Sequence, residues 1–280
     1  MQLFRRILDI PGQDDEWRIL EATVDDEHGW ATTAGRLLRE QQYREALSIY
    51  RQAQEDTSSE PAVRRQFGRA LSQAKRPDDA LIAVDRAIEQ DPTAQESWKL
   101  RGVILSEFER QEEAITSFEH AFEHAKDDAS RAILLRGIGN AQWELKRYQQ
   151  GLETLNRAIA LDPTDAPSWS NRGNCLADLG RLEEALASYE RALALNPRYA
   201  VAWNNKGNTL RHLRRYPEAL AALDRAIELD PESGLGWLTK AQTLRDMRAY
   251  ADAISAYERA IPCAFSELAP MPTLGSSSMP

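Results

Sequence analysis

The sequence has few cysteines, no excess of basic residues and no long apolar run. Cys175 and Cys263 are its two cysteines, and neither lies in a CxxC motif. We therefore predict neither a zinc site nor a disulfide framework, and we expect a reducing, cytoplasmic location. A formal net charge of −9 argues against nucleic-acid binding, which requires lysines and arginines to neutralise phosphates. No stretch approaches the roughly 20 apolar residues that span a bilayer, so we expect no membrane insertion.

Signatures of catalysis are also scarce. The sequence has no glycine-rich phosphate loop, and no serine or cysteine nucleophile is placed beside a histidine and an acid. His120 and His124 are four residues apart, but the sequence positions no third metal ligand. We expect no enzymatic activity, no cofactor and no metal.

What the sequence does contain is an internal repeat. A small residue recurs every 34 residues, with one interval of 37, at Ala34, Gly68, Gly102, Gly139, Gly173, Gly207 and Ala241. Two further small-residue series, which begin at Ala46 and Ala53, have the same intervals. The three series together define seven units, 27–60, 61–94, 95–128, 132–165, 166–199, 200–233 and 234–267.

Each unit is expected to form a helical hairpin. In the fifth unit, the spacing of Trp169, Gly173 and Leu176 places them on one face of a first helix. The small residue lets the second helix approach closely, and Tyr189 supplies bulk on that helix. Pro197 closes the unit, because proline disfavours helix in the residue before it. One hairpin cannot bury its apolar stripe alone, so we expect the hairpins to stack.

Residues 169–176 (WSNRGNCL), followed by Ala185, Tyr189, Ala192 and Pro197, resemble the tetratricopeptide repeat. The resemblance implies an all-α fold, a right-handed superhelical α-solenoid of tandem helix-turn-helix repeats. It also implies a non-enzymatic protein–protein interaction scaffold, which binds an extended peptide or partner segment in a concave groove lined by the first helices.

The array and its ends divide the chain into five predicted segments. These are N-terminal capping helices at 1–26, repeats 1–3 at 27–128, an insertion at 129–131, repeats 4–7 at 132–267 and a disordered tail rich in proline and serine at 268–280. We expect the insertion to lengthen a helix or bend a junction, so that two rigid subarrays meet near 124–132. We expect Pro262 to stop the last helix early and to leave an apolar face uncovered.

Asparagines mark the predicted groove. Asparagine is a poor helix former, because its amide competes for backbone hydrogen bonds. In a groove, amides could instead bind a peptide main chain, and arginines could receive acidic side chains. The predicted groove residues are Arg136, Asn140, Asn171, Asn174, Asn204, Asn205, Asn208, Arg211, Gln242 and Arg245. The alternative is that Gly-Asn is simply common in this repeat and helps solubility or local capping.

The resemblance also allows a more specific hypothesis to be examined. Some tetratricopeptide repeat proteins hold the acidic C-terminal peptide of a chaperone in a two-carboxylate clamp. Arg136, Asn140 and Asn171 match the first three clamp positions approximately, whereas Val201 and Asn205 replace its last two cations. The clamp is incomplete.

Two other functions stay open. Similar repeats accompany catalytic domains in glycosyltransferases and signalling enzymes, so the chain could be the targeting or regulatory part of a larger enzyme assembly. Copies of the chain could also associate through the uncovered C-terminal repeat.

Overall fold

The computed structural model describes residues 45, 48 and 61–268. The predicted capping helices at 1–26, nearly all of the first repeat at 27–60 and residues 269–280 of the tail lie outside these residues. In the described part the chain is an all-α repeat solenoid, with twelve helices and no strand.

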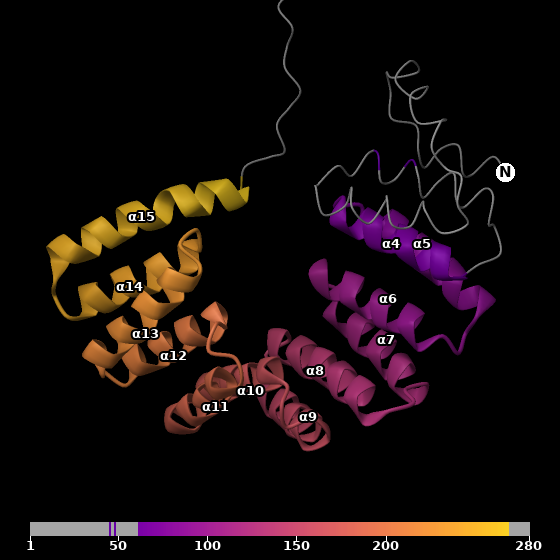
Figure 1. Ribbon diagram of the computed structural model, residues 1–280, viewed down its shortest axis with the longest axis horizontal. Helices are drawn as coiled ribbons and strands as arrows, with labels where there is room; N and C mark the ends of the chain where they lie inside the picture. Colours follow the sequence, from indigo (N-terminus) through magenta and orange to yellow (C-terminus); the bar gives the residue numbers. More distant parts are fainter. Residues whose placement is uncertain (1–44, 46–47, 49–60, 269–280) are drawn as a thin grey trace, which may run out of the picture. The chain divides into compact units, whose positions relative to one another are not determined.

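The described helices alternate as the first and second helices of repeats 2–7 (Figure 1). The first helices are α4 (Pro61–Gln73), α6 (Gln95–Glu107), α8 (Asp128–Glu144), α10 (Ala166–Asp178), α12 (Ala200–His212) and α14 (Gly234–Asp246). The second helices are α5 (Pro77–Gln90), α7 (Gln111–Glu123), α9 (Tyr148–Leu161), α11 (Leu182–Leu195), α13 (Tyr216–Leu229) and α15 (Tyr250–Leu268).

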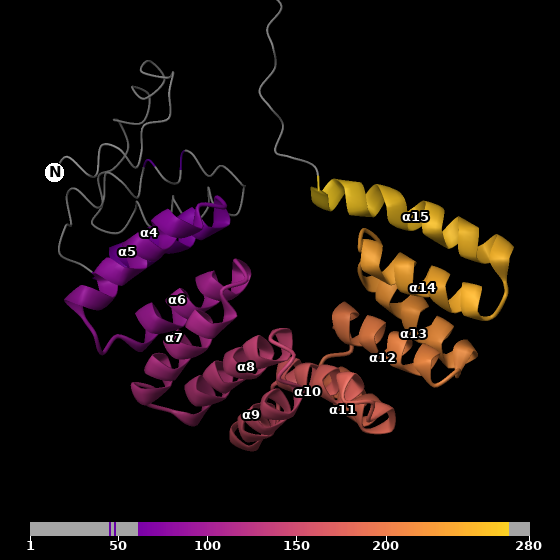
Figure 2. The ribbon, with the colours of Figure 1, turned by 180° about the vertical axis from the view of Figure 1, so that it is seen from behind.

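The described helices belong to two compact units, which divide between Ala141 and Gln142. The boundary lies inside α8, later in the chain than the segment 124–132 at which the sequence predicts a junction. In the second unit, α10 packs against α11, α12 against α13 and α14 against α15, as the reverse view also shows (Figure 2).

Glycine on the first helix allows the α10–α11 and α12–α13 hairpins to close, as the sequence predicts. A Cβ at Gly173 would lie 2.5 Å from Cε1 of Tyr189, and one at Gly207 would lie 2.6 Å from Cγ of Leu223. Both large side chains come from the second helix of the same repeat, sixteen residues later. The small residue and the bulky residue therefore form one packing pair.

The tryptophans join consecutive repeats by a hydrogen bond as well as by packing. The indole Nε1–H of Trp169 donates to the backbone carbonyl of Pro163, with a nitrogen–oxygen distance of 3.0 Å. Trp98, Trp203 and Trp237 make the same bond to the proline six residues earlier, at 2.9, 3.0 and 3.1 Å. The proline that closes one repeat thus anchors the first helix of the next.

A left-handed residue reverses the chain inside each hairpin. The φ angles at Lys75, Glu109, Lys146, Gly180, Arg214 and Arg248 lie between 58° and 75°. Only one of these six residues is glycine. An arginine follows this residue in several repeats and holds a carboxylate in the first turn of the second helix, as in the 2.7 Å ion pair between Arg181 and Glu184.

The insertion before the fourth repeat lengthens a helix, which is one of the two outcomes expected from the sequence. Helix α8 has 17 residues, whereas α10, α12 and α14 have 13. Asp127 caps the longer helix, because its carboxylate accepts hydrogen bonds from the backbone N–H and the hydroxyl of Ser130, at 2.7 and 3.0 Å.

The prediction that Pro262 ends the last helix is wrong. Helix α15 continues through Pro262 to Leu268 and has 19 residues, compared with 14 in α13. Proline in a helix removes one backbone donor and strains the preceding turn, but here twelve helical residues precede it. The helix is therefore established before the proline and extends beyond it.

Candidate functional site

The predicted groove residues lie on four first helices. Arg136 and Asn140 are half-buried on α8, in the first compact unit. The other eight lie on α10, α12 and α14, in the second compact unit, where their contacts with one another are defined.

Two of the asparagines connect consecutive repeats. Nδ2 of Asn205 on α12 donates to Oδ1 of Asn174 on α10, at 2.9 Å. The same Oδ1 accepts from the hydroxyl of Tyr189, also at 2.9 Å. Tyr189 is the buried ring that packs on Gly173. These asparagines therefore link the surface of the first helices to the core of the fifth repeat.

Asn204 occupies a different environment from its neighbour. Its side chain is buried, and its Oδ1 has no hydrogen-bond partner. Its Nδ2 lies 3.5 Å from Oδ1 of Asn205, at the limit of a hydrogen bond.

The arginines of the last two repeats share one carboxylate. Arg211 on α12 donates to Asp246 on α14 at 2.8 Å and to Oδ1 of Asn208 at 3.0 Å. Arg245 contacts the other oxygen of Asp246, at 3.1 Å. Hydrogen bonds from these two arginines, chiefly from Arg211, hold the pKa of Asp246 below its usual value. Of the two arginine side chains, that of Arg245 is the more exposed, at 55% against 14%.

Asn171 and Gln242 keep their amides available. Both are half-buried, and neither makes a side-chain hydrogen bond to another described residue. Asn171 lies one helical turn before Asn174, and Gln242 lies one turn before Arg245 or Asp246. These amides flank the bonded network on α10 and α14.

Some carboxylates that take part in the site were not predicted from the sequence. Asp246 accepts from Arg211, which lies 35 residues earlier. The same spacing joins Trp143 Nε1 to Asp178, at 2.6 Å, and Ser72 to Glu107, at 2.7 Å. A donor near the end of one first helix, followed by an acid 35 residues later, is the sequence signal that could have found them.

Exposed apolar side chains lie on two of the same helices, although the groove residues predicted from the sequence are all polar or charged. Val201 on α12 is 54% exposed, and Leu235 on α14 is 57% exposed. Leu238, one turn after Leu235, is exposed as well. Val201 precedes Asn205 and Asn208 by four and seven residues, so all three share one face of α12. On α12 and α14 the surface is therefore mixed, with apolar residues near the start of the helix and polar residues further along.

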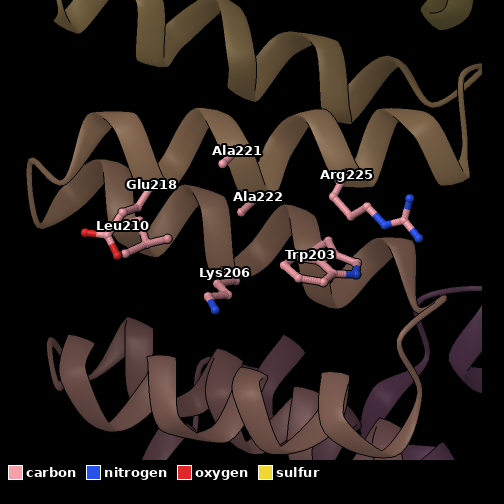
Figure 3. Close-up of a pocket in the computed structure, with 7 residues that line it drawn as sticks. All are labelled: Trp203, Lys206, Leu210, Glu218, Ala221, Ala222 and Arg225. Atoms are coloured by element: carbon pink, nitrogen blue, oxygen red, sulfur yellow. The ribbon is translucent and has the colours of Figure 1, made fainter.

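A pocket of about 420 Å³ lies where α12 and α13 meet (Figure 3). Trp203, Lys206, Leu210, Glu218, Ala221, Ala222 and Arg225 line it. The charged groups around it are paired with neighbours: Lys206 with Glu190 at 3.0 Å, and Arg225 with Glu228 at 2.7 Å. We interpret this pocket as a hollow of the repeat packing.

The remaining candidate groups for chemistry are inert or dispersed. Burial raises the pKa of the Cys175 thiol to about 12, so the thiol stays protonated and unreactive near neutral pH. Among the described residues, no three histidine, cysteine or acidic side chains gather in a way that could hold a metal ion. No helix in the described part is long and apolar enough to cross a membrane.

Family comparisons agree with the repeat geometry. A tetratricopeptide repeat model matches residues 170–234, and a second one matches residues 37–104. The chain is a tetratricopeptide repeat protein. A model described as a bacterial transcriptional activator domain matches residues 123–198 of this repeat protein. No curated protein sequence matches it significantly.

Solved structures share the fold of this tetratricopeptide repeat protein. The APC/C hetero-tetramer Cut9–Hcn1 has a TM-score of 0.70 at 15% identity, over 87% of this chain and 47% of that chain. PilW, a widely conserved type IV pilus biogenesis factor, has a TM-score of 0.63 at 20% identity, over 74% of this chain and 94% of its own. PilF of Pseudomonas aeruginosa has a TM-score of 0.60 at 18% identity, over 74% and 92%. At these identities the similarity extends to the fold alone.

Proposed function

We propose that this tetratricopeptide repeat protein is a non-enzymatic scaffold, which binds an extended peptide or partner segment on the first-helix face of α10, α12 and α14. The observation that carries the proposal is the mixed surface of that face. Val201 and Leu235 expose apolar side chains, and the Asn174–Asn205 pair holds polar groups beside them. An extended segment presents both an amide backbone and side chains, so it can satisfy such a surface.

The partner segment that fits this surface best carries an apolar side chain and few acidic residues. Arg211 is already neutralised by Asp246 at 2.8 Å, which leaves Arg245 as the accessible cation of the pair. A strongly acidic segment would have to compete with Asp246 for both arginines. We therefore assign the main contacts to Val201, Leu235 and the available amide of Asn171.

A selected peptide tests this proposal without knowledge of the natural partner. A phage-displayed library of random peptides is selected on the full chain, and the affinity of a selected peptide is measured by fluorescence anisotropy. We expect Val201→Ser to weaken binding about tenfold, because a buried valine contributes about 1.5 kcal/mol. Asn171→Ala should weaken it as well, with little change in helicity.

The matched control is Ile82→Ser, which changes an exposed apolar residue on a second helix in the other compact unit. It should leave the affinity unchanged. If neither groove substitution alters the affinity, or if Ile82→Ser alters it equally, peptide binding at this face is refuted.

A second candidate function is association between copies of the chain through the last repeat. Tyr250, Ile254 and Ile261 on α15 are all highly exposed. They lie on a second helix, whereas the proposed peptide site lies on first helices, so the two functions are compatible.

A further inference from the structure

The fifth position of the repeat is cationic in one compact unit and uncharged in the other. Repeats 2, 3 and 4 place Arg65, Lys99 and Arg136 there, on α4, α6 and the part of α8 that belongs to the first unit. Repeats 5, 6 and 7 place Ser170, Asn204 and Leu238 at the same position. The first-helix face of the first unit therefore carries a row of cations that the second unit lacks.

Helix α4 adds to this positive charge. It contains Arg64, Arg65 and Arg69 and no acidic residue. Arg69 is exposed and lies one turn after Arg65 on the same face. Neither Arg65 nor Arg69 forms an ion pair with another described residue, and Arg65 donates to Oγ of Ser97 at 3.5 Å, the limit of a hydrogen bond. These two charges are therefore available to a ligand.

Two acidic residues on the same face of α6 offset the cations in part. Glu96 pairs with Lys99 at 2.7 Å, and Glu107 accepts a hydrogen bond from the hydroxyl of Ser72, also at 2.7 Å. The pair of Glu96 with Lys99 is exposed and lies within one helix, and such pairs contribute little, so a carboxylate of a ligand can compete for Lys99. The face is positive on balance, although the whole chain has a net charge of −9.

Exposed apolar side chains lie among the cations. Val103 follows Lys99 by one turn of α6, and Ile133 precedes Arg136 by three residues on α8. Both are exposed. An acidic peptide segment can offer carboxylates to the cations and apolar side chains to these two residues. The phosphates of a nucleic acid would satisfy the cations alone, so the face fits an acidic peptide better.

We propose that the first-helix face of α4, α6 and residues 128–141 of α8 binds an acidic peptide segment of a partner protein. This goes beyond the peptide site proposed on α10, α12 and α14, whose partner carries few acidic residues. The two surfaces lie on different compact units and differ in charge. One chain can therefore hold two segments of different chemistry.

The geometry also indicates a spacing for the acidic residues. Helices α4 and α6 contact each other, and helices in contact lie about 8–10 Å apart. In the polyproline II conformation, side chains three residues apart lie on the same side of the segment, separated by about 9 Å. Acidic side chains at every third position can therefore meet Arg65 and Lys99 in turn.

Fluorescence anisotropy with the full chain and a labelled peptide that has glutamate at every third position tests the proposal. The reference peptide has glutamine in place of each glutamate. We expect the glutamate peptide to bind at least about tenfold more tightly, and its affinity to fall as salt is added, because salt screens exposed charges. Arg65→Gln combined with Arg69→Gln should weaken binding about tenfold, whereas Arg65→Lys combined with Arg69→Lys, which keeps the charges, should retain most of the affinity.

The matched control is Arg157→Gln combined with Arg191→Gln, which removes two exposed arginines from second helices of the other compact unit. It should leave the affinity for the glutamate peptide unchanged. Val201→Ser should leave it unchanged as well, which separates this site from the one proposed on α12. Circular dichroism verifies the fold of each variant.

Three results would overturn the proposal. Equal affinity for the glutamate and glutamine peptides overturns the preference for an acidic segment. A loss of affinity in the control double variant as large as that in the Arg65 and Arg69 double variant overturns the placement on the first unit. A single-stranded oligonucleotide that displaces the peptide more effectively than an acidic peptide of equal charge overturns the assignment to a protein partner.

Discussion

Replacing Gly173 by alanine tests the packing logic of the whole array. The added Cβ would lie 2.5 Å from Cε1 and 2.8 Å from Cζ of Tyr189. The tyrosine ring has little room to move, because it is 2% exposed and its hydroxyl is bonded to Asn174. Leu152, Leu155 and other buried residues surround it. Either the ring or the whole second helix must shift.

Two effects of opposite sign determine the magnitude. Alanine is favoured over glycine in a helix by about 1 kcal/mol. Overpacking of a close-packed core costs about 1–3 kcal/mol, and the cost here should lie at the upper end because the contact is with a confined ring. We therefore expect Gly173→Ala to lower the free energy of unfolding by about 2 kcal/mol. Helix propensity alone predicts a change of the opposite sign.

Urea unfolding, followed by circular dichroism, measures the difference. Gly180→Ala is the matched control: Gly180 has a φ of 75° and no atom within 4 Å of an added Cβ. Its substitution should cost only the strain of a left-handed alanine, about 1 kcal/mol. If Gly173→Ala proves neutral or stabilising, the proposed close approach at Gly173 is refuted.

Three further predictions concern other contacts. Trp169→Phe removes the indole bond to Pro163 and should lower stability by about 1 kcal/mol, measured by urea unfolding; an unchanged midpoint would contradict the anchoring role. Iodoacetamide at about pH 9, which is the ordinary pKa of the thiol, should label Cys175 only after unfolding. Mass spectrometry of the peptide that contains Cys175 measures the labelling. The free energy of unfolding should also fall as the pH rises above 9, because the thiol ionises at a lower pH in the unfolded chain than in the folded one. Asp246 has a lowered pKa, so the stability that it contributes is present above about pH 4 and is lost as the pH falls further. Asp246→Asn should remove this part of the decrease in stability at acid pH and should cost about 1 kcal/mol at neutral pH. If the stability of the variant depends on acid pH as that of the wild type does, the result counts against the pair with Arg211.

The hairpins could be predicted because their determinants are local. A small residue on one helix and a bulky residue sixteen positions later, as in Gly173 with Tyr189, must meet whenever two helices of this length form a hairpin. The lengthening of α8 was one of two outcomes that the sequence left open, the other being a bent junction. The end of α15 was not predicted correctly, because the penalty for Pro262 is a single local cost that the rest of the helix outweighs.

The candidate site was only partly predictable. The sequence indicates that Asn174, Asn205 and Arg211 lie on first helices, and the structure places them there. It does not indicate that Asn205 bonds to Asn174, or that Arg211 is neutralised by Asp246. Both contacts cross between repeats, so they depend on the stacking offset between neighbouring hairpins, which no pattern within one repeat contains.

The central claim is that partners bind on the first-helix face of the second compact unit, and site-specific photocrosslinking tests it most directly. Benzoylphenylalanine is introduced in place of Leu235 on α14 or, as a comparison, in place of Tyr250 on α15; both native side chains are highly exposed. We predict that a library-selected peptide crosslinks at position 235 and not at position 250. A crosslink at position 250 with none at position 235 would contradict the claim.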